Sequence, residues 1–140
     1  DNDEFTAPLP SLEQAKAEKC AEIDQERDAL ISRGMSYDFP DGDTGTIQLR
    51  DLKDHRNIQG LGSNGLKLKV VGDTESKVPF RDEENNEHEL SGDELIDMAE
   101  AVSNWVQGHY SNAWAHKDNV RALETVQDVI DYDFSEGWPS

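Results

Sequence analysis

Apolar residues at helical spacing between residues 91 and 130 constrain the fold most strongly. The segment begins with Ser-Gly-Asp-Glu, a capping box in which Ser91 and Glu94 satisfy the first turn of a helix. After a polar interruption the apolar pattern resumes, which fits either one long helix or two helices that meet near Lys117 and Asp118. The apolar positions before the interruption are Leu95, Met98, Ala99, Val102, Val106, Tyr110 and Ala113.

A second helix is predicted near the start of the chain. Ser11 is a favourable N-cap, and Gly34 is a favourable residue just past the end. The apolar residues between them form one narrow stripe, which needs another element to pack on. The stripe consists of Leu12, Ala15, Ile23 and Leu30.

Between the two helices, the sequence alternates as strands do. The turn-rich segment 40–45 separates residues 35–39 from residues 47–49, which predicts a β-hairpin. Residues 51–59 suggest a short helix or turn that closes at Gly60, and Leu66–Val70 alternates with lysines like a half-exposed strand. Two further strands are expected around a turn at residues 82–87.

This layout predicts an α+β fold: an N-terminal amphipathic helix, a small antiparallel β-hairpin region and a long C-terminal helix. We expect one domain over residues 11–130. Residues 1–10 carry two prolines and no periodicity, so they are expected to form an extended arm or linker. Residues 131–140 form an acidic, aromatic C-terminal tail.

Charge limits the partners of this chain. Its 31 acidic residues outnumber its 13 basic residues and give a formal net charge of -18. Such an excess repels phosphate backbones and anionic membrane surfaces, and no apolar run is long enough to span a bilayer. We therefore expect no nucleic-acid partner and no membrane insertion. Cys20 is the single cysteine, so no internal disulfide forms.

No motif in the chain predicts catalysis or a cofactor. The stretch Gly60–Gly65 spells G-x-G-x-x-G, but a strand rather than a helix is expected after it, which favours a glycine turn over a nucleotide site. Asp41 and Asp43 are weak candidates for a calcium loop that lacks further ligands. The histidines do not have metal-site spacing and are expected at the surface or at an interface: His55, His88, His109 and His116.

The aromatic residues of the long helix indicate more than one packed face. Trp105 and Tyr110 are five residues apart, so they point in different directions. Either the helix is buried on two sides within one domain, or its second face packs on another subunit. Trp138 in the tail allows the same two interpretations. The candidate interface residues are Leu12, Ile23, Leu30, Trp105, Tyr110, Trp114 and Trp138.

Several segments, in this order, resemble an uncharacterised bacteriophage domain found in tail-fibre and tail-associated proteins. The resemblance covers about residues 11–139. The matching segments are Ala15-Lys-Ala-Glu-Lys-Cys-Ala-Glu-Ile23 with Arg27-Asp28, Phe39-Pro-Asp-Gly42, Gly45-Thr-Ile-Gln-Leu-Arg50, Asn57-Ile-Gln-Gly60, Val78-Pro-Phe80, Leu90-Ser-Gly-Asp-Glu-Leu95 with Val102 and Val106, Ile130-Asp-Tyr-Asp-Phe134 and Gly137-Trp-Pro139.

The resemblance implies a non-enzymatic structural protein of the virion tail or tail fibre, synthesised in the host cytoplasm, that acts as an adaptor. Its expected partners are other phage tail or fibre proteins, in a homo-oligomer or a hetero-complex. Two alternatives remain: a fibre-assembly chaperone that is absent from the mature particle, and a calcium-dependent receptor-binding module that uses Asp41 and Asp43.

Overall fold

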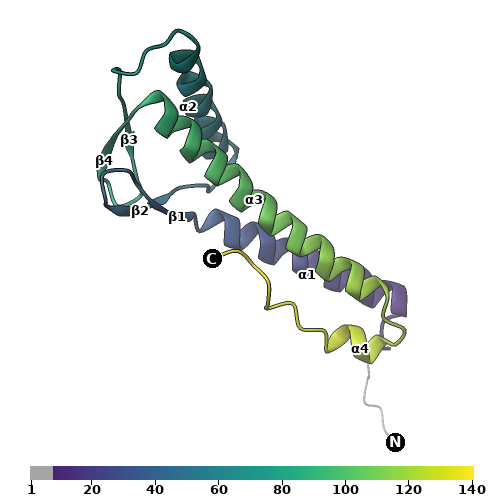
Figure 1. Ribbon diagram of the computed structural model, residues 1–140. Helices are drawn as coiled ribbons and strands as arrows, with labels where there is room; N and C mark the ends of the chain where they lie inside the picture. The colour runs from purple at the N-terminus through teal and green to yellow at the C-terminus, as the bar shows by residue number, and fades with distance from the viewer. Residues whose placement is uncertain (1–7) are drawn as a thin grey trace, which may run out of the picture.

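The computed structural model describes residues 8–140 (Figure 1). The expected arm over residues 1–10 lies largely outside the described residues. The elements follow the chain in the order α1 (Leu12–Ser32), β1 (Met35–Asp38), β2 (Thr44–Ile47), α2 (Leu52–Val70), β3 (Val78–Arg81), β4 (Glu87–Leu90), α3 (Gly92–Arg121) and α4 (Val126–Ile130). The predicted α+β class is confirmed.

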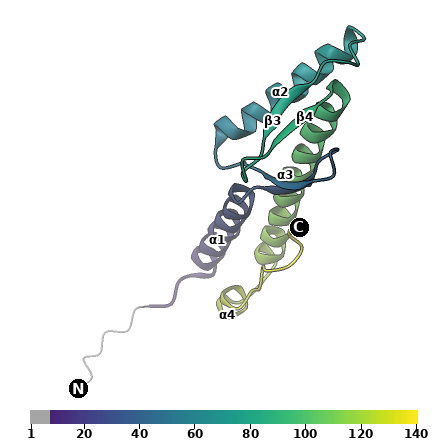
Figure 2. The ribbon, with the colours of Figure 1, turned by 90° about the vertical axis from the view of Figure 1, so that its left-hand side faces the viewer.

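Helix α3 forms the long axis of the molecule. Helices α1 and α2 pack on the same side of α3, one after the other along its length (Figures 1 and 2). Gly62 faces Ala99 and Gly65 faces Gly92, so α2 runs antiparallel to α3. Helices α1 and α2 therefore lie one after the other along α3, with the first hairpin between them in the chain.

The predicted N-cap at Ser11 and the predicted capping box at Ser91 are both present, and Ser11 also forms a capping box, with Gln14, that was not predicted. The hydroxyl of Ser11 accepts from the backbone N–H of Gln14, and the hydroxyl of Ser91 accepts from that of Glu94. Helix α3 continues through residues 117 and 118, so the interpretation as one long helix is confirmed there. The resumed apolar pattern belongs partly to the short helix α4, which follows a turn.

Two separate hairpins replace a continuous sheet. Strands β1 and β2 pair antiparallel with Met35 opposite Ile47, and strands β3 and β4 pair antiparallel with Val78 opposite Leu90. The hairpins meet where the backbone N–H of Glu83 donates to the carbonyl of Thr46, 2.9 Å away.

The apolar interior consists of two clusters along α3. The hairpin-side core joins the hairpins to α2 and the first half of α3, and the tail-side core joins α1 and α4 to the second half of α3. The hairpin-side core contains Ile31, Met35, Phe39, Ile47, Leu49, Ile58, Phe80, Leu90, Leu95, Met98 and Val102. The tail-side core contains Ala15, Ile23, Ala113, Val120 and Val129.

A helix was one of the two alternatives expected over residues 51–59, but the predicted end at Gly60 was wrong, because α2 is one continuous helix of 19 residues. The glycines lie inside this helix rather than in a turn. A Cβ on Gly65 would stand 2.5 Å from the carbonyl oxygen of Gly92, and a Cβ on Gly62 would stand 2.7 Å from the side chain of Ala99. Glycine therefore allows α2 to approach α3 closely, which offsets its low helix propensity.

The strand expected at Leu66–Val70 is the last turn of α2. Leu68 is half-buried, whereas Leu66 and Val70 lie on the outer face of the helix with exposed fractions of 55% and 77%. Two different helix faces thus produced an alternation that resembles a strand. None of the helices in the described part of the chain is long and apolar enough to cross a membrane.

Candidate functional site

An open apolar groove runs along the flank of α3 beside the N-terminal end of α2. Its two adjoining hollows each measure about 340 Å³ and share His55, Val106 and Tyr110. One hollow extends along α3 to Trp114, and the other reaches the end of α1 and Leu52. This groove lies at the junction of three helices, where α1 ends and α2 begins.

Tyr110 and Trp114 form the aromatic edge of the groove. Trp114 is 50% exposed, and its ring centroid lies 6.3 Å from that of Tyr110. The guanidinium of Arg27 lies over the ring of Tyr110, 4.4 Å from the ring centroid, and pairs with Asp24 and Asp28. A half-exposed tryptophan next to an anchored tyrosine suits the recognition of a polypeptide.

The other candidate interface residues on α1 and α3 serve the chain itself. Ile23 is fully buried in the tail-side core, and Leu12 is half-buried against the same core. Leu30 is also half-buried. Trp105 is half-buried, and its indole N–H donates to the carbonyl of Ser140, 2.9 Å away. Of all the candidate interface residues, Tyr110 and Trp114 are the ones that line the groove.

The C-terminal tail folds back along α3. Trp138 stacks near His109 and His116, with ring centroids 6.2 and 5.8 Å away, and its indole N–H donates to the carbonyl of Phe134. Trp138 therefore closes the tail-side core, which is one of its two expected roles. His116 also bonds the hydroxyl of Tyr132 at 2.6 Å, so the tail is held by polar contacts as well.

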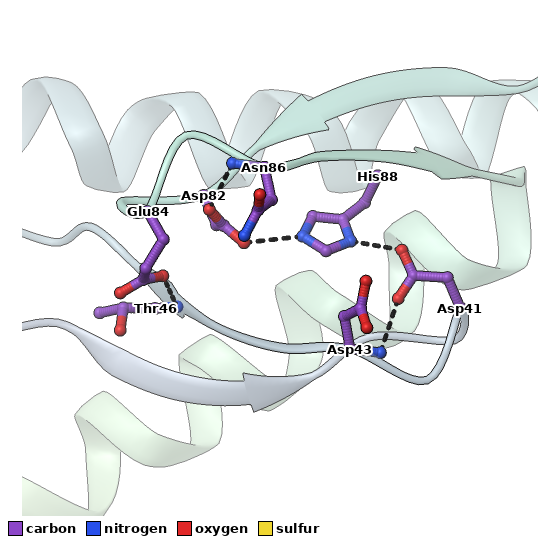
Figure 3. Close-up of polar contacts among 7 residues, drawn as sticks. All are labelled: Asp41, Asp43, Thr46, Asp82, Glu84, Asn86 and His88. Atoms are coloured by element: carbon purple, nitrogen blue, oxygen red, sulfur yellow. Dashed lines mark hydrogen bonds and ion pairs between the residues drawn. The ribbon is translucent and has the colours of Figure 1, made fainter.

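A buried histidine joins the two hairpins (Figure 3). Nδ1 of His88 lies 2.5 Å from Oδ2 of Asp41 in the first hairpin turn, and Nε2 lies 2.8 Å from Oδ2 of Asp82 at the end of β3. The imidazole is 1% exposed, and the Asp82 side chain is fully buried. Nearby, Glu84 accepts from the backbone N–H of Thr46 at 2.8 Å, which adds a second link between the hairpins.

Electrostatics favour a charged imidazolium at this position. Burial opposes the charge, but hydrogen bonds to Asp82 and Asp41 outweigh it, so the pKa of His88 is raised. Burial also favours neutral Asp82, yet bonds from His88 and from the backbone N–H of Asn86 lower its pKa. The backbone N–H of Asp43 and the imidazole lower the pKa of Asp41. With a carboxylate at each ring nitrogen, both nitrogens donate.

The expectation that the histidines lie at the surface was wrong for His88 and His109, which are each 1% exposed. The signal for His88 was its spacing of two from Leu90, which places both on the inner face of β4. Asp41, a weak calcium candidate, instead accepts from His88 and from the backbone N–H of Asp43. Within residues 8–140, no three acidic, histidine or cysteine side chains are arranged to hold a metal ion.

A protein-family profile described as a domain of unknown function, DUF4376, matches residues 14–136. The chain belongs to the DUF4376 family. No curated protein matches the chain, and no solved structure matches it. The matched part of this DUF4376 domain spans both hairpins, the groove and most of the returning tail. The family description assigns no activity.

Proposed function

We propose that the chain is a structural component of a bacteriophage tail or tail fibre that acts as a protein–protein interaction module. The observation that carries this proposal is the groove edged by Tyr110 and Trp114. It presents apolar and aromatic surface on rigid helices, as polypeptide-binding grooves do. The resemblance of the ordered sequence segments to tail-associated phage domains supplies the context.

Mass spectrometry of purified particles of the source virus tests the structural role. The chain is expected at a fixed ratio to the tail or fibre proteins. A second test is the variant Trp114→Glu, which places a charge on the groove edge and should reduce incorporation into particles. Ala115→Glu adds the same charge at an exposed position of α3 that does not line the groove and serves as the control. Absence of the wild-type chain from particles rejects the structural role.

The charge of the chain favours a second candidate, a chaperone for fibre assembly. A net charge of -18 would keep a complex with an aggregation-prone client soluble. This role predicts abundance in infected-cell lysate, absence from particles, and misfolded fibres when the gene is deleted. Particles that contain the chain at a fixed ratio, or fibres that fold normally without it, reject the chaperone.

A further inference from the structure

The outer face of α2 differs in charge from the rest of the chain. Helix α2 carries four basic residues and one acidic residue, a formal charge of +3. Since the whole chain carries -18, the remaining residues carry -21. Within residues 8–140, three of the four α2 bases form no ion pair, and Lys69 forms one exposed contact of 3.6 Å with Asp93. The three unpaired bases are Lys53, Arg56 and Lys67.

The same face of α2 is apolar between its charges. Leu52, Leu66 and Val70 are 61%, 55% and 77% exposed. At 100° per residue these three side chains lie within 40° of one another, about 100–145° around the helix from the side that contacts α3. Leu52 also lines the groove. A helix face that exposes large aliphatic side chains among unpaired cations is typical of an interface.

The outer face of α1 has the complementary character. Helix α1 carries six acids and three bases, a formal charge of -3. All three bases are used within the chain: Lys16 donates to the carbonyl of Arg121, Lys19 to that of Ile130, and Arg27 covers Tyr110. The outer face is thus left with acids and alanines, among them Glu13, Ala17, Glu18, Ala21 and Glu22, together with the neutral side chains of Gln14 and Gln25.

The arrangement of the two helices allows both faces to be used at once. Helices α1 and α2 lie on the same side of α3, end to end, with the groove at their junction (Figure 2). At 1.5 Å per residue they are about 31 and 28 Å long, so their lengths match. A two-fold axis through the junction places α2 of one molecule along α1 of another, and the reverse, in two equal contacts.

We infer that two copies of this chain form an antiparallel dimer in which the basic, aliphatic face of α2 lies along the acidic, alanine-rich face of α1 of the other copy. Leu66 and Val70, one turn apart, meet Ala17 and Ala21, also one turn apart, and the flanking charges attract. A second copy fits better than a nucleic acid because -21 on the remainder repels polyanions. The inference does not depend on the proposed function, since a dimer forms in solution without viral partners.

Light scattering and sedimentation equilibrium of the full chain test the dimer. The mass is expected to be twice that of the chain at about 150 mM salt, where screening weakens the repulsion between the two net charges of -18 more than the attraction between charges in direct contact. Lys67→Glu with Lys69→Glu, or Glu18→Lys with Glu22→Lys, should each weaken the dimer by at least about tenfold in Kd, because these four side chains lie in the same part of the antiparallel contact. All four changes together restore opposite charges and should recover the dimer.

Two matched controls reverse charges away from both faces. Lys77→Glu, before β3, and Glu100→Lys, on the exposed side of α3, are expected to leave the dimer unchanged. Far-UV circular dichroism confirms that each variant stays helical. A wild-type chain that is monomeric at all concentrations overturns the inference. A chain that stays monomeric but binds a separate acidic protein through α2 overturns it as well. A dimer that survives both reversals, or is not recovered by the fourfold variant, also overturns it.

Discussion

The imidazole of His88 lies flat against the ring of Phe39, with centroids 3.6 Å apart and 6° between the planes. Phe39 belongs to the hairpin-side core, while the edges of the imidazole face Asp41 and Asp82. The face of the His88 ring therefore packs on the apolar core, while its two nitrogen atoms form charged hydrogen bonds with Asp41 and Asp82. A cation above an aromatic ring gains further attraction when it is removed from water.

Replacing His88 by alanine should strongly destabilise the fold. The change removes the imidazolium and leaves the buried carboxylate of Asp82 without its charge partner, which costs about 3 kcal/mol in the free energy of unfolding. Urea unfolding followed by circular dichroism measures the loss. Asp41→Asn is the matched comparison: its side chain is 42% exposed, and a smaller loss is expected. If both variants lost the same unfolding free energy, the pair of His88 with buried Asp82 would not be the main source of the stabilisation.

The stabilisation by His88 should depend on pH in a defined direction. The folded-state pKa of His88 is raised above 6.5, so the contribution is complete below pH 6.5 and is lost as pH rises through the higher folded value. The pKa of Asp82 is lowered below 3.8, so its contribution is complete above pH 3.8 and is lost as pH falls through the lower folded value. The link is strongest between these limits.

Urea unfolding of the wild type and of His88→Ala across pH 4 to 10 measures this dependence, since ionisable groups that do not contact His88 cancel in the difference. The difference in unfolding free energy should be largest near pH 5 and shrink in alkaline solution. A difference that grows between pH 6.5 and 10 would show that the neutral imidazole is the favoured form.

Two glycines of α2 should respond oppositely to alanine. A Cβ on Gly65 meets the carbonyl oxygen of Gly92 at 2.5 Å, so Gly65→Ala should push α2 away from α3 and cost about 1–3 kcal/mol. No heavy atom lies within 4 Å of a Cβ on Gly60, so Gly60→Ala should stabilise the protein by about 0.5–1 kcal/mol through helix propensity. Thermal unfolding of both variants measures the contrast, and stabilisation by both would contradict the close helix contact.

The tryptophans should differ in their access to solvent. Trp114 is 50% exposed, whereas Trp105 and Trp138 are half-buried and donate hydrogen bonds from their indole nitrogens. Three variants that each keep one tryptophan and replace the other two by phenylalanine allow acrylamide quenching at each site. The variant that keeps Trp114 should show the steepest quenching and the most red-shifted emission. Weaker quenching of Trp114 than of Trp105 would show that the groove edge is covered.

The sequence was sufficient for elements defined by local signals. The N-cap at Ser11, the capping box at Ser91, the turn residues of the hairpins and the apolar period of α3 all depend on neighbours in the chain, and the elements predicted from them are present. Helix α2 could not be recognised in this way. Gly62 and Gly65 are favoured there by contacts with Ala99 and Gly92, which are distant in sequence. Tertiary packing overrode local propensity.

The candidate site was predictable only in part. Trp105, Tyr110 and Trp114 were expected not to face one core together, and of these three Tyr110 and Trp114 line the groove. Trp105 and Trp138 could not be separated from them by sequence, because the path of the tail over α3 decides their burial. The partnership of Asp41 with His88 joins residues 47 positions apart, and only the contact of the two hairpins creates it.

Helices α1 and α3 each contribute side chains to both apolar clusters, since Ile31 belongs to the hairpin-side core while Ala15 and Ile23 belong to the tail-side core. Amide hydrogen exchange should therefore reveal a hierarchy along each helix rather than uniform protection. The small tail-side cluster is expected to open first, with α4 and residues 131–140 exchanging early, while the amides around Met98 and Val102 exchange only through complete unfolding. The groove lies where α1 ends, beside the middle of α3, so a partner that binds there only when both clusters are closed should slow amide exchange in both of them.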